Sequence, residues 1–217
     1  MTYTCILWDV DGTLIDGSDG ILNRLTTVLT QFGYPAPDRT ELSGWIGPPM
    51  FDSFQHELGM SATEAAEAVT RYRMVTKDYG YVRDTRLYPG VAELIAEIAA
   101  SGTPQATASS KPHGQLLTLM EHYQLTEYFA AIVGATPDEK TLAAKTDIVA
   151  EALRQLAASG ADLSRPVLVG DRHHDVVGGS ANGIPVIFVR WGFSKPGEAE
   201  GAAAVAQNAD ELRQLLR

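Results

Sequence analysis

The sequence predicts an α/β protein with a doubly wound parallel sheet and an all-helical domain inserted after the first strand. Short apolar, partly β-branched runs alternate with amphipathic stretches through most of the 217 residues, which is the pattern of repeated β/α units. Residues 15–82 break this alternation, because they contain helical patterns but no convincing strand. We therefore expect a discontinuous core domain of residues 1–14 and 83–217, and a helical domain of residues 15–82.

The predicted strands each end at a small, polar or charged residue, and apolar stripes at helical spacing lie between them. Gly102, Gly160 and Gly183 stand where helices should end before the next strand. Units of this kind assemble into a Rossmann-like sheet. The expected strands are residues 4–8, 103–108, 131–133, 166–169 and 185–189, and the stripes of the core helices are residues 91–98, 116–120 and 148–156.

The inserted segment contains three helical stripes, at residues 22–32, 50–58 and 65–75. Tyr88-Pro89-Gly90 then marks the return to the core domain, because proline and glycine punctuate the start of the next helix. Near the end of the chain, the alanine-rich residues 198–206 predict a loop or a weak helix edge.

Composition excludes several classes of function. Cys5 is the single cysteine, so disulfides and cysteine-rich zinc sites are excluded. The formal net charge of −10 disfavours broad contact with a nucleic-acid backbone, which depends on lysine and arginine displacing counterions. Asp9 and Asp11 interrupt the first apolar run before it could serve as a signal peptide or membrane span. We expect a soluble cytoplasmic protein that binds neither nucleic acid nor membranes.

Acidic residues follow two of the predicted strands. Asp9 and Asp11 lie two residues apart after the first strand, so they leave it on the same side. Asp171 and Asp175, within GDRHHD at residues 170–175, follow the fourth predicted strand. Ligands gather beyond the carboxyl ends of strands in open α/β sheets, so both clusters should meet at one edge. Facing carboxylates need a hard divalent cation between them, and oxygen ligands suit Mg²⁺ better than zinc.

Four motifs, in this order, resemble those of the haloacid dehalogenase-like hydrolases. They are DVDGTL at residues 9–14, a Ser/Thr-rich strand end at residues 107–111, a later lysine, and GDRHHD at residues 170–175. The early helical insertion and the run WIGPP at residues 45–49 resemble the phosphoglycolate phosphatase-like branch, which has an α-helical cap. The resemblance spans nearly the whole chain. It implies a magnesium-dependent phosphatase that hydrolyses a small phosphate monoester through an aspartyl-phosphate.

The resemblance also implies roles for the acidic residues, position by position. Asp9 would be the nucleophile, and Asp11 the acid that protonates the leaving oxygen and later deprotonates water. Mg²⁺ would be bound by Asp9, by the main-chain carbonyl of Asp11 and by Asp171, with Asp175 as a ligand or as support through water. His173 and His174 are assigned no ligand role, because adjacent histidines on a loop are more often surface groups.

The second and third motifs supply a hydroxyl and a lysine. Thr107, Ser109 and Ser110 all offer the hydroxyl that would bind a phosphoryl oxygen, and the spacing from the following Lys-Pro pair favours Ser109. Lys145 fits the third motif better than Lys140, because it directly precedes a helical stripe. Lys145 would pair with Asp9 and neutralise developing charge.

Substrate contacts are expected from both domains. Arg24, His56 or Arg86 could meet a carboxylate or second polar group. The glycine and prolines of residues 47–49, in the helical domain, would form a rigid loop that points towards the active site. The residues predicted to bind substrate are Gly12, Thr13, Gly47 and Ser110.

Other functions compete with the phosphatase. A sugar phosphomutase returns the phosphoryl group to a sugar instead of passing it to water. A pyrophosphatase is a further alternative. A phospho-receiver signalling module fits less well, because such modules lack a long helical insertion after the first strand. The expected partner is a small phosphorylated metabolite, and the expected state is a monomer or weak homodimer.

Overall fold

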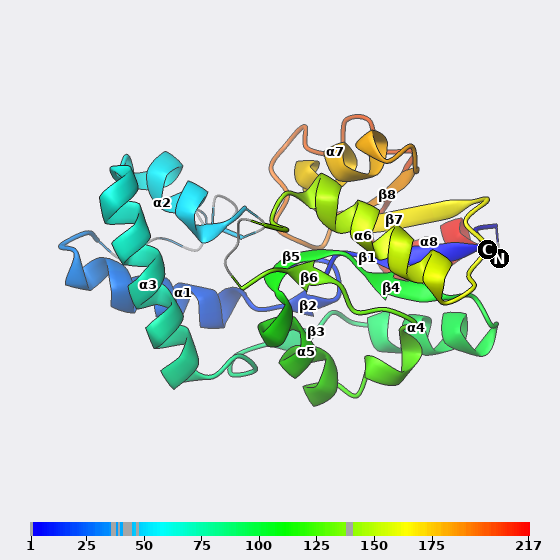
Figure 1. Ribbon diagram of the computed structural model, residues 1–217, viewed down its shortest axis with the longest axis horizontal. Helices are drawn as coiled ribbons and strands as arrows, with labels where there is room; N and C mark the ends of the chain where they lie inside the picture. The colour runs from blue at the N-terminus through cyan, green and yellow to red at the C-terminus, as the bar shows by residue number, and fades with distance from the viewer. Residues whose placement is uncertain (1, 36–37, 39, 41–44, 47, 138–140) are drawn as a thin grey trace.

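The computed structural model describes residues 2–35, 38, 40, 45–46, 48–137 and 141–217. Its main sheet has five strands in the order β4-β1-β7-β8-β9, and every neighbouring pair is parallel (Figure 1). The predicted parallel α/β fold is confirmed. The strands are β1 Cys5–Trp8, β4 Gln105–Thr107, β7 Pro166–Gly170, β8 Val186–Val189 and β9 Ala204–Ala206.

Helices cover both faces of this sheet, and the two-residue period of the strands divides the core between them. In β1, Ile6 and Trp8 pack on the face covered by α4, α5 and α8, whereas Cys5 and Leu7 pack on the face covered by α6 and α7 (Figure 1). The central strands are buried on both sides, which explains their unbroken apolar sequences. These helices are α4 Val91–Ala100, α5 His113–His122, α6 Lys145–Ala158, α7 His173–Ala181 and α8 Ala209–Leu216, with a 3₁₀ helix at Thr126–Tyr128.

The inserted segment forms three helices that pack on one another beyond the carboxyl end of the sheet (Figure 1). They are α1 Ser18–Gln31, α2 Met50–Leu58 and α3 Ala62–Tyr79. Their buried residues, including Leu25 and Phe54, form an apolar cluster separate from the two clusters of the sheet. On this separation we propose that residues 15–82 are a cap domain and that residues 1–14 and 83–217 are the core domain.

Two short ribbons lie outside the main sheet. β2 Ile15–Asp16 pairs antiparallel with β3 Arg86–Leu87, so the two chain crossings between core and cap lie side by side. β5 Ser109–Pro112 pairs in parallel with β6 Gly134–Ala135. This ribbon continues the line of β4 towards the cap.

Some boundaries differ from those expected from the sequence. Residues 131–133 are not a strand; Ala131 makes an isolated bridge with Ala106, and β6 follows at Gly134. Residues 198–206 contain β9, which pairs with β8 at the edge of the sheet. Alanine has little preference for strands, so this pairing depends on the neighbouring strand rather than on local sequence.

Candidate active site

The predicted acidic clusters meet at the carboxyl edge of the sheet. Asp9 follows the end of β1, Asp171 follows the end of β7, and Asp175 lies in the first turn of α7. The three side chains are buried, and each offers a carboxylate oxygen within 4.8 Å of the others. The parallel topology therefore brings together residues more than 160 positions apart, as their positions after strand ends predict.

Lys145 joins two of these carboxylates. It is the first residue of α6, and its Nζ lies 2.6 Å from Asp9 Oδ1 and 2.7 Å from Asp175 Oδ1. The side chains of this triad are at most 9% exposed, so the charges interact with little screening by solvent. The alternative lysine, Lys140, lies outside the described residues.

Burial and mutual repulsion alter the pKa values of these groups. Burial raises the pKa of Asp9 to about 7, with Lys145 opposing the rise and Asp175 adding to it. Burial, and then the charges of Asp9 and Asp175, raise the pKa of Asp171 well above its ordinary value. Burial disfavours the charged form of Lys145, but Asp175 and Asp9 outweigh it and raise the pKa of the lysine. Among the described residues of this cluster, the ammonium group of Lys145 pairs with two of the three carboxyl groups, and the third, Asp171, adds acidic charge beside them.

This donor set fits a hard divalent cation. Carboxylate oxygens are the ligands that magnesium and calcium prefer, and an added cation would offset the burial and the repulsion that together raise the pKa of Asp9 and Asp171. Asp9, Asp171 and Asp175 could hold such an ion. His173 and His174 have exposed side chains and do not belong to this group.

Asp171 is held in place by its neighbours. The Thr13 hydroxyl donates to Oδ1 at 3.2 Å, and the backbone N–H of Phe193 donates to Oδ2 at 2.7 Å. Gly12 and Gly192 let the backbone approach closely, because a Cβ at either position would lie 2.2 Å from Asp171 Oδ2. Gly12 also has a φ of +85°, which favours glycine. The structure thus places Gly12 and Thr13 against the Asp171 carboxylate.

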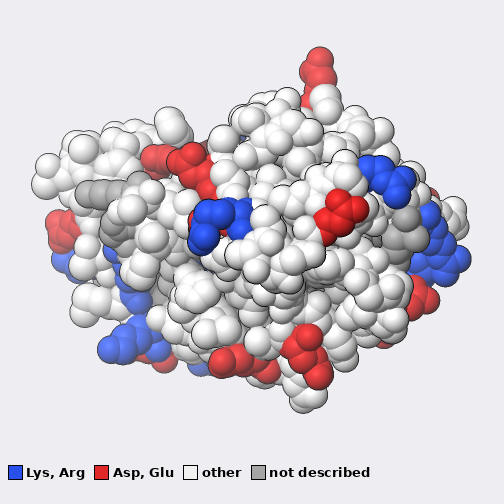
Figure 2. Space-filling view, turned by 45° about the vertical axis from the view of Figure 1, so that its right-hand side comes forward, with Lys and Arg blue, Asp and Glu red and all other residues white. Residues whose placement is uncertain are grey.

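A pocket adjoins this cluster on the cap side, with a cavity volume of about 90 Å³. The core contributes Asp9, Asp11, Ser109, Ser110 and Lys111 to its wall. Figure 2 shows basic and acidic side chains together in the hollow between the two lobes of the molecule. The predicted catalytic residues of the first two motifs therefore face one pocket.

Within the core wall, Lys111 pairs with Asp11. Lys111 Nζ lies 2.9 Å from Asp11 Oδ2, and both side chains are largely buried. This pair was not expected from the sequence, where Lys111 served only to mark the second motif; a lysine directly after two serines was the available signal. Asp11 contributes no carboxylate to the group formed by Asp9, Asp171 and Asp175.

The three hydroxyl candidates have different surroundings. Thr107 is fully buried, and its hydroxyl donates to the Val133 carbonyl at 3.1 Å and accepts from the Val133 N–H at 2.8 Å. The Ser109 hydroxyl oxygen accepts a hydrogen bond from the backbone N–H of Lys111 at 3.2 Å. Ser109 and Ser110 both line the pocket. The geometry favours the serines, because the hydroxyl of Thr107 is engaged by the backbone.

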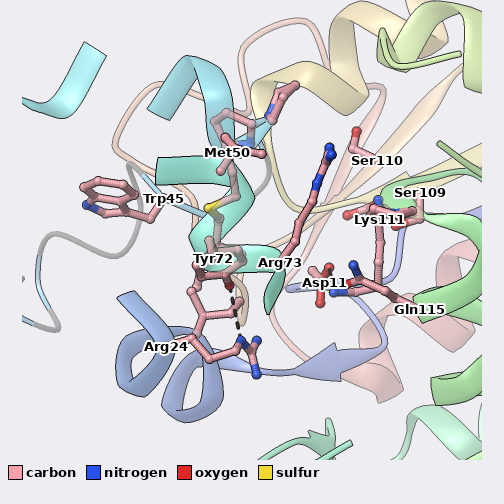
Figure 3. Close-up of a pocket in the computed structure, with 17 residues that line it drawn as sticks. Asp11, Arg24, Trp45, Met50, Tyr72, Arg73, Ser109, Ser110, Lys111 and Gln115 are labelled. Atoms are coloured by element: carbon pink, nitrogen blue, oxygen red, sulfur yellow. Dashed lines mark hydrogen bonds and ion pairs between the residues drawn. The ribbon is translucent and has the colours of Figure 1, made fainter. Parts of the chain in front are cut away.

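Cap residues form the opposite wall. Figure 3 shows Arg24, Tyr72 and Arg73 of the cap across from Asp11 and Lys111 of the core. Arg73 and Tyr72 were not expected from the sequence, because nothing local distinguishes them from other polar residues of a helix. Gly47 lies outside the described residues. His56 is exposed, and Arg86, 63% exposed in its side chain, pairs with Asp16 and Asp19.

Arg172, within the fourth motif, links the core to the cap. Its guanidinium donates to both carboxylate oxygens of Glu198 and to the main-chain carbonyl of Ile46. Its backbone N–H donates to Asp175 Oδ2 at 3.0 Å. One buried residue therefore connects the Asp175 carboxylate with Ile46, a cap residue that lines the pocket.

The model of the family described as haloacid dehalogenase-like hydrolase matches residues 6–189. The chain belongs to this family. The four-motif resemblance and the expected enzyme class, a phosphatase-type hydrolase, are confirmed. Among the described residues, no helix has both the length and the apolar character to span a membrane.

Relatives cover almost the whole chain. A 5'-nucleotidase from Pseudomonas aeruginosa is 31% identical over 218 residues, which cover 100% of this chain and 96% of that protein. The tyrosine-protein kinase PtkA of Mycobacterium tuberculosis is 31% identical over 97% of this chain and 72% of its own length. The crystal structure of a predicted phosphatase from Clostridium acetobutylicum has a TM-score of 0.90 and 30% identity, covering 100% of this chain and 99% of that one. Phosphoglycolate phosphatases are among the further relatives.

Proposed function

We propose that this protein is a magnesium-dependent phosphatase that hydrolyses a small phosphate monoester through an aspartyl-phosphate formed on Asp9. The observation that carries the proposal is the triad in which Lys145 bridges Asp9 and Asp175, beside Asp171 and at the edge of the pocket. Such an arrangement holds a carboxylate nucleophile beside a fixed positive charge and a set of oxygen ligands for a cation.

In the first step, an oxygen of Asp9 attacks phosphorus and the bond from phosphorus to the leaving oxygen breaks. Asp11 donates its proton to that oxygen. In the second step Asp11 takes a proton from water, the water oxygen attacks phosphorus, and the bond to Asp9 breaks to release inorganic phosphate. Position supports both roles, because Asp9 and Asp11 line the same pocket.

Other residues of the chain would bind and orient the phosphoryl group. Ser109 and Ser110 offer hydroxyls at the pocket wall, and Lys145 offers an ammonium group beside Asp9. Lys111 would hold the Asp11 carboxylate in place at the pocket. Mg²⁺, when bound by Asp9, Asp171 and Asp175, supplies positive charge that screens the nucleophile from the anionic phosphoryl group. The main-chain carbonyl of Asp11 stays a predicted fourth ligand.

Relatives support a small substrate without selecting one. Phosphoglycolate-like esters, nucleotides and sugar phosphates are therefore the classes to compare, because a fold does not encode specificity. The nucleotidase relative supports nucleoside monophosphates in this panel.

The prediction of a monomer or weak homodimer is tested by sedimentation.

The proposal is tested by measuring free phosphate released from a panel of phosphate esters with Mg²⁺, for the wild type and for Asp9→Asn. We expect the variant to keep its fold, as measured by circular dichroism, and its rate to fall at least about 10³-fold, because the proposed nucleophile is lost. Asp78→Asn, at an exposed position of α3, is the matched control and should retain full activity. Substantial activity in Asp9→Asn would refute the nucleophile.

Two further results would refute the phosphatase itself. Isomerised sugar phosphate without free phosphate would identify a phosphomutase. ATP is included in the panel of substrates because one relative is named a tyrosine-protein kinase. Phosphotyrosine formed from ATP, with no ester hydrolysed, would indicate transfer to a protein acceptor.

A further inference from the structure

Arg24 is a buried cation that the proposed chemistry does not use. It lies on α1, is 5% exposed, and lines the same pocket as Asp9 and Asp11. Among the described residues, its Nη1 atom meets no hydrogen-bond acceptor although the atom is buried. Its Nε donates to the Tyr72 hydroxyl at 3.4 Å, and the guanidinium lies 5.8 and 5.7 Å from the ring centroids of Tyr72 and Tyr79.

These contacts leave the charge of Arg24 incompletely compensated. A guanidinium cannot lose its proton in a protein, so burial cannot be relieved by neutralisation as it can for lysine. The two tyrosine rings offset part of the desolvation through cation–π attraction. A buried charge is ordinarily paired, so an anion that reached Nη1 would supply the missing acceptor.

The cap wall of the pocket attracts negative charge. The described cap residues that line it include Arg24 and Arg73 but no aspartate or glutamate, and the remaining ones are mainly apolar or aromatic. The acidic lining residues, Asp9 and Asp11, come from the core. Figure 3 shows Arg24 on the cap side of the pocket, across from Asp11. An anion bound to Arg24 would thus lie apart from the carboxylates of the core.

We infer that Arg24 binds a second anionic group of the substrate. The substrate is then a phosphate monoester of a short alcohol that also carries a carboxylate or a second phosphate. The cavity of about 90 Å³ fits a short connection between the two anions, because sites for drug-sized ligands span roughly 300–1,000 Å³. This inference rests on the proposed phosphatase function, with the transferred phosphate at Asp9 and the second anion at Arg24.

Binding of non-hydrolysable phosphonates tests the subsite without turnover. The probes are phosphonoacetate, which has a carboxylate, methylenebisphosphonate, which has a second phosphonate, and ethylphosphonate, which has an uncharged tail. With Mg²⁺ present, calorimetry on the wild type should show at least one charged-tail probe binding about 10- to 100-fold more tightly than ethylphosphonate, as expected for a charge-assisted hydrogen bond. Comparing the first two probes identifies the preferred anion.

Variants test whether Arg24 causes the preference for charged-tail probes over ethylphosphonate. Arg24→Met should remove it, so that all three probes bind alike, and Arg24→Lys should restore part of it. Arg71→Met is the matched control, because Arg71 lies on the exposed side of α3 and pairs with Glu67. The control should bind as the wild type does. Equal binding of all probes by the wild type would overturn the inference, even if Arg24→Met failed to fold.

Hydrolysis assays separate this inference from the proposed function. If the wild type hydrolyses phosphate esters with charged and uncharged tails equally well, and Arg24→Met does the same, the phosphatase stands and the subsite is refuted. If no ester is hydrolysed but the Arg24-dependent preference among phosphonates persists, the anion subsite stands and the phosphatase is refuted.

Discussion

Replacement of Lys145 by methionine removes the ammonium group that bridges Asp9 and Asp175. The side chains of the three residues are 7%, 9% and 2% exposed, so the pairs belong with buried salt bridges rather than with surface pairs. Removing one partner of a buried pair costs about 3–5 kcal/mol, whereas surface pairs contribute about 0–1 kcal/mol. For a protein of this size, that loss lowers Tm by about 6–20 °C.

The assay is urea unfolding in EDTA at pH 8, followed by circular dichroism. Lys77→Met is the matched control, because Lys77 is an exposed lysine on α3 and its loss should change stability by less than about 0.5 kcal/mol. Adding Mg²⁺ should then stabilise Lys145→Met more than it stabilises the wild type, because the carboxylates lack their fixed counter-charge and ligand binding favours the folded state.

Two results would refute this reasoning. If the stability of Lys145→Met in EDTA lay within about 1 kcal/mol of the Lys77→Met control, the bridge would not be a buried pair of the expected strength. If Mg²⁺ stabilised the wild type and the variant equally, the lysine and the metal would not act on the same carboxylates. Activity should also fall by about 10²-fold or more, because a fixed charge beside the nucleophile is lost.

Three further predictions concern other parts of the chain. Gly192→Ala should destabilise the protein by about 1–3 kcal/mol in urea unfolding and weaken binding in a Mg²⁺ titration, since its Cβ would lie 2.2 Å from Asp171 Oδ2. Gly114→Ala is the control and should cause neither change, because its Cβ would meet nothing within 4 Å. Cys5 should not react with Ellman's reagent at pH 8 until guanidinium unfolds the chain, because it is fully buried and burial, followed by Asp162, raises its pKa to about 11; rapid labelling of the native protein would contradict this. Ser61→Ala should cost about 1 kcal/mol in thermal unfolding through loss of the capping box with Glu64 at the start of α3, and an unchanged Tm would show that this helix end does not limit stability.

The location of the site was predictable because parallel β/α topology converts local position into spatial proximity. Asp9 and Asp171 each follow an apolar run. If both runs are parallel strands of one sheet, both carboxylates must lie at its carboxyl edge. Lys145 was predictable for a similar reason, since it begins a helix that starts at the same edge.

Contacts that do not follow from the parallel β/α topology were not predictable from the sequence. The choice of Ser109 or Ser110 over Thr107 depends on the Val133 backbone, which engages the threonine hydroxyl. Arg24 was one of three residues expected to meet a second polar group of the substrate, and nothing local distinguished it from Arg86. Burial of its guanidinium depends on how α1 packs beside α3, which is a property of the assembled cap.

The sequence by itself determined the α/β core, the helical insertion, the ordered motifs and the acidic edge, because periodicity and strand ends are local features of the chain. Only the tertiary structure decided which charges meet. It paired Lys111 with Asp11, added Asp175 to the expected pair of Lys145 and Asp9, and left a buried nitrogen of Arg24, a pocket-lining residue, without an acceptor among the described residues. Those outcomes depend on distances and burial, which fix electrostatic energies and which no local pattern encodes.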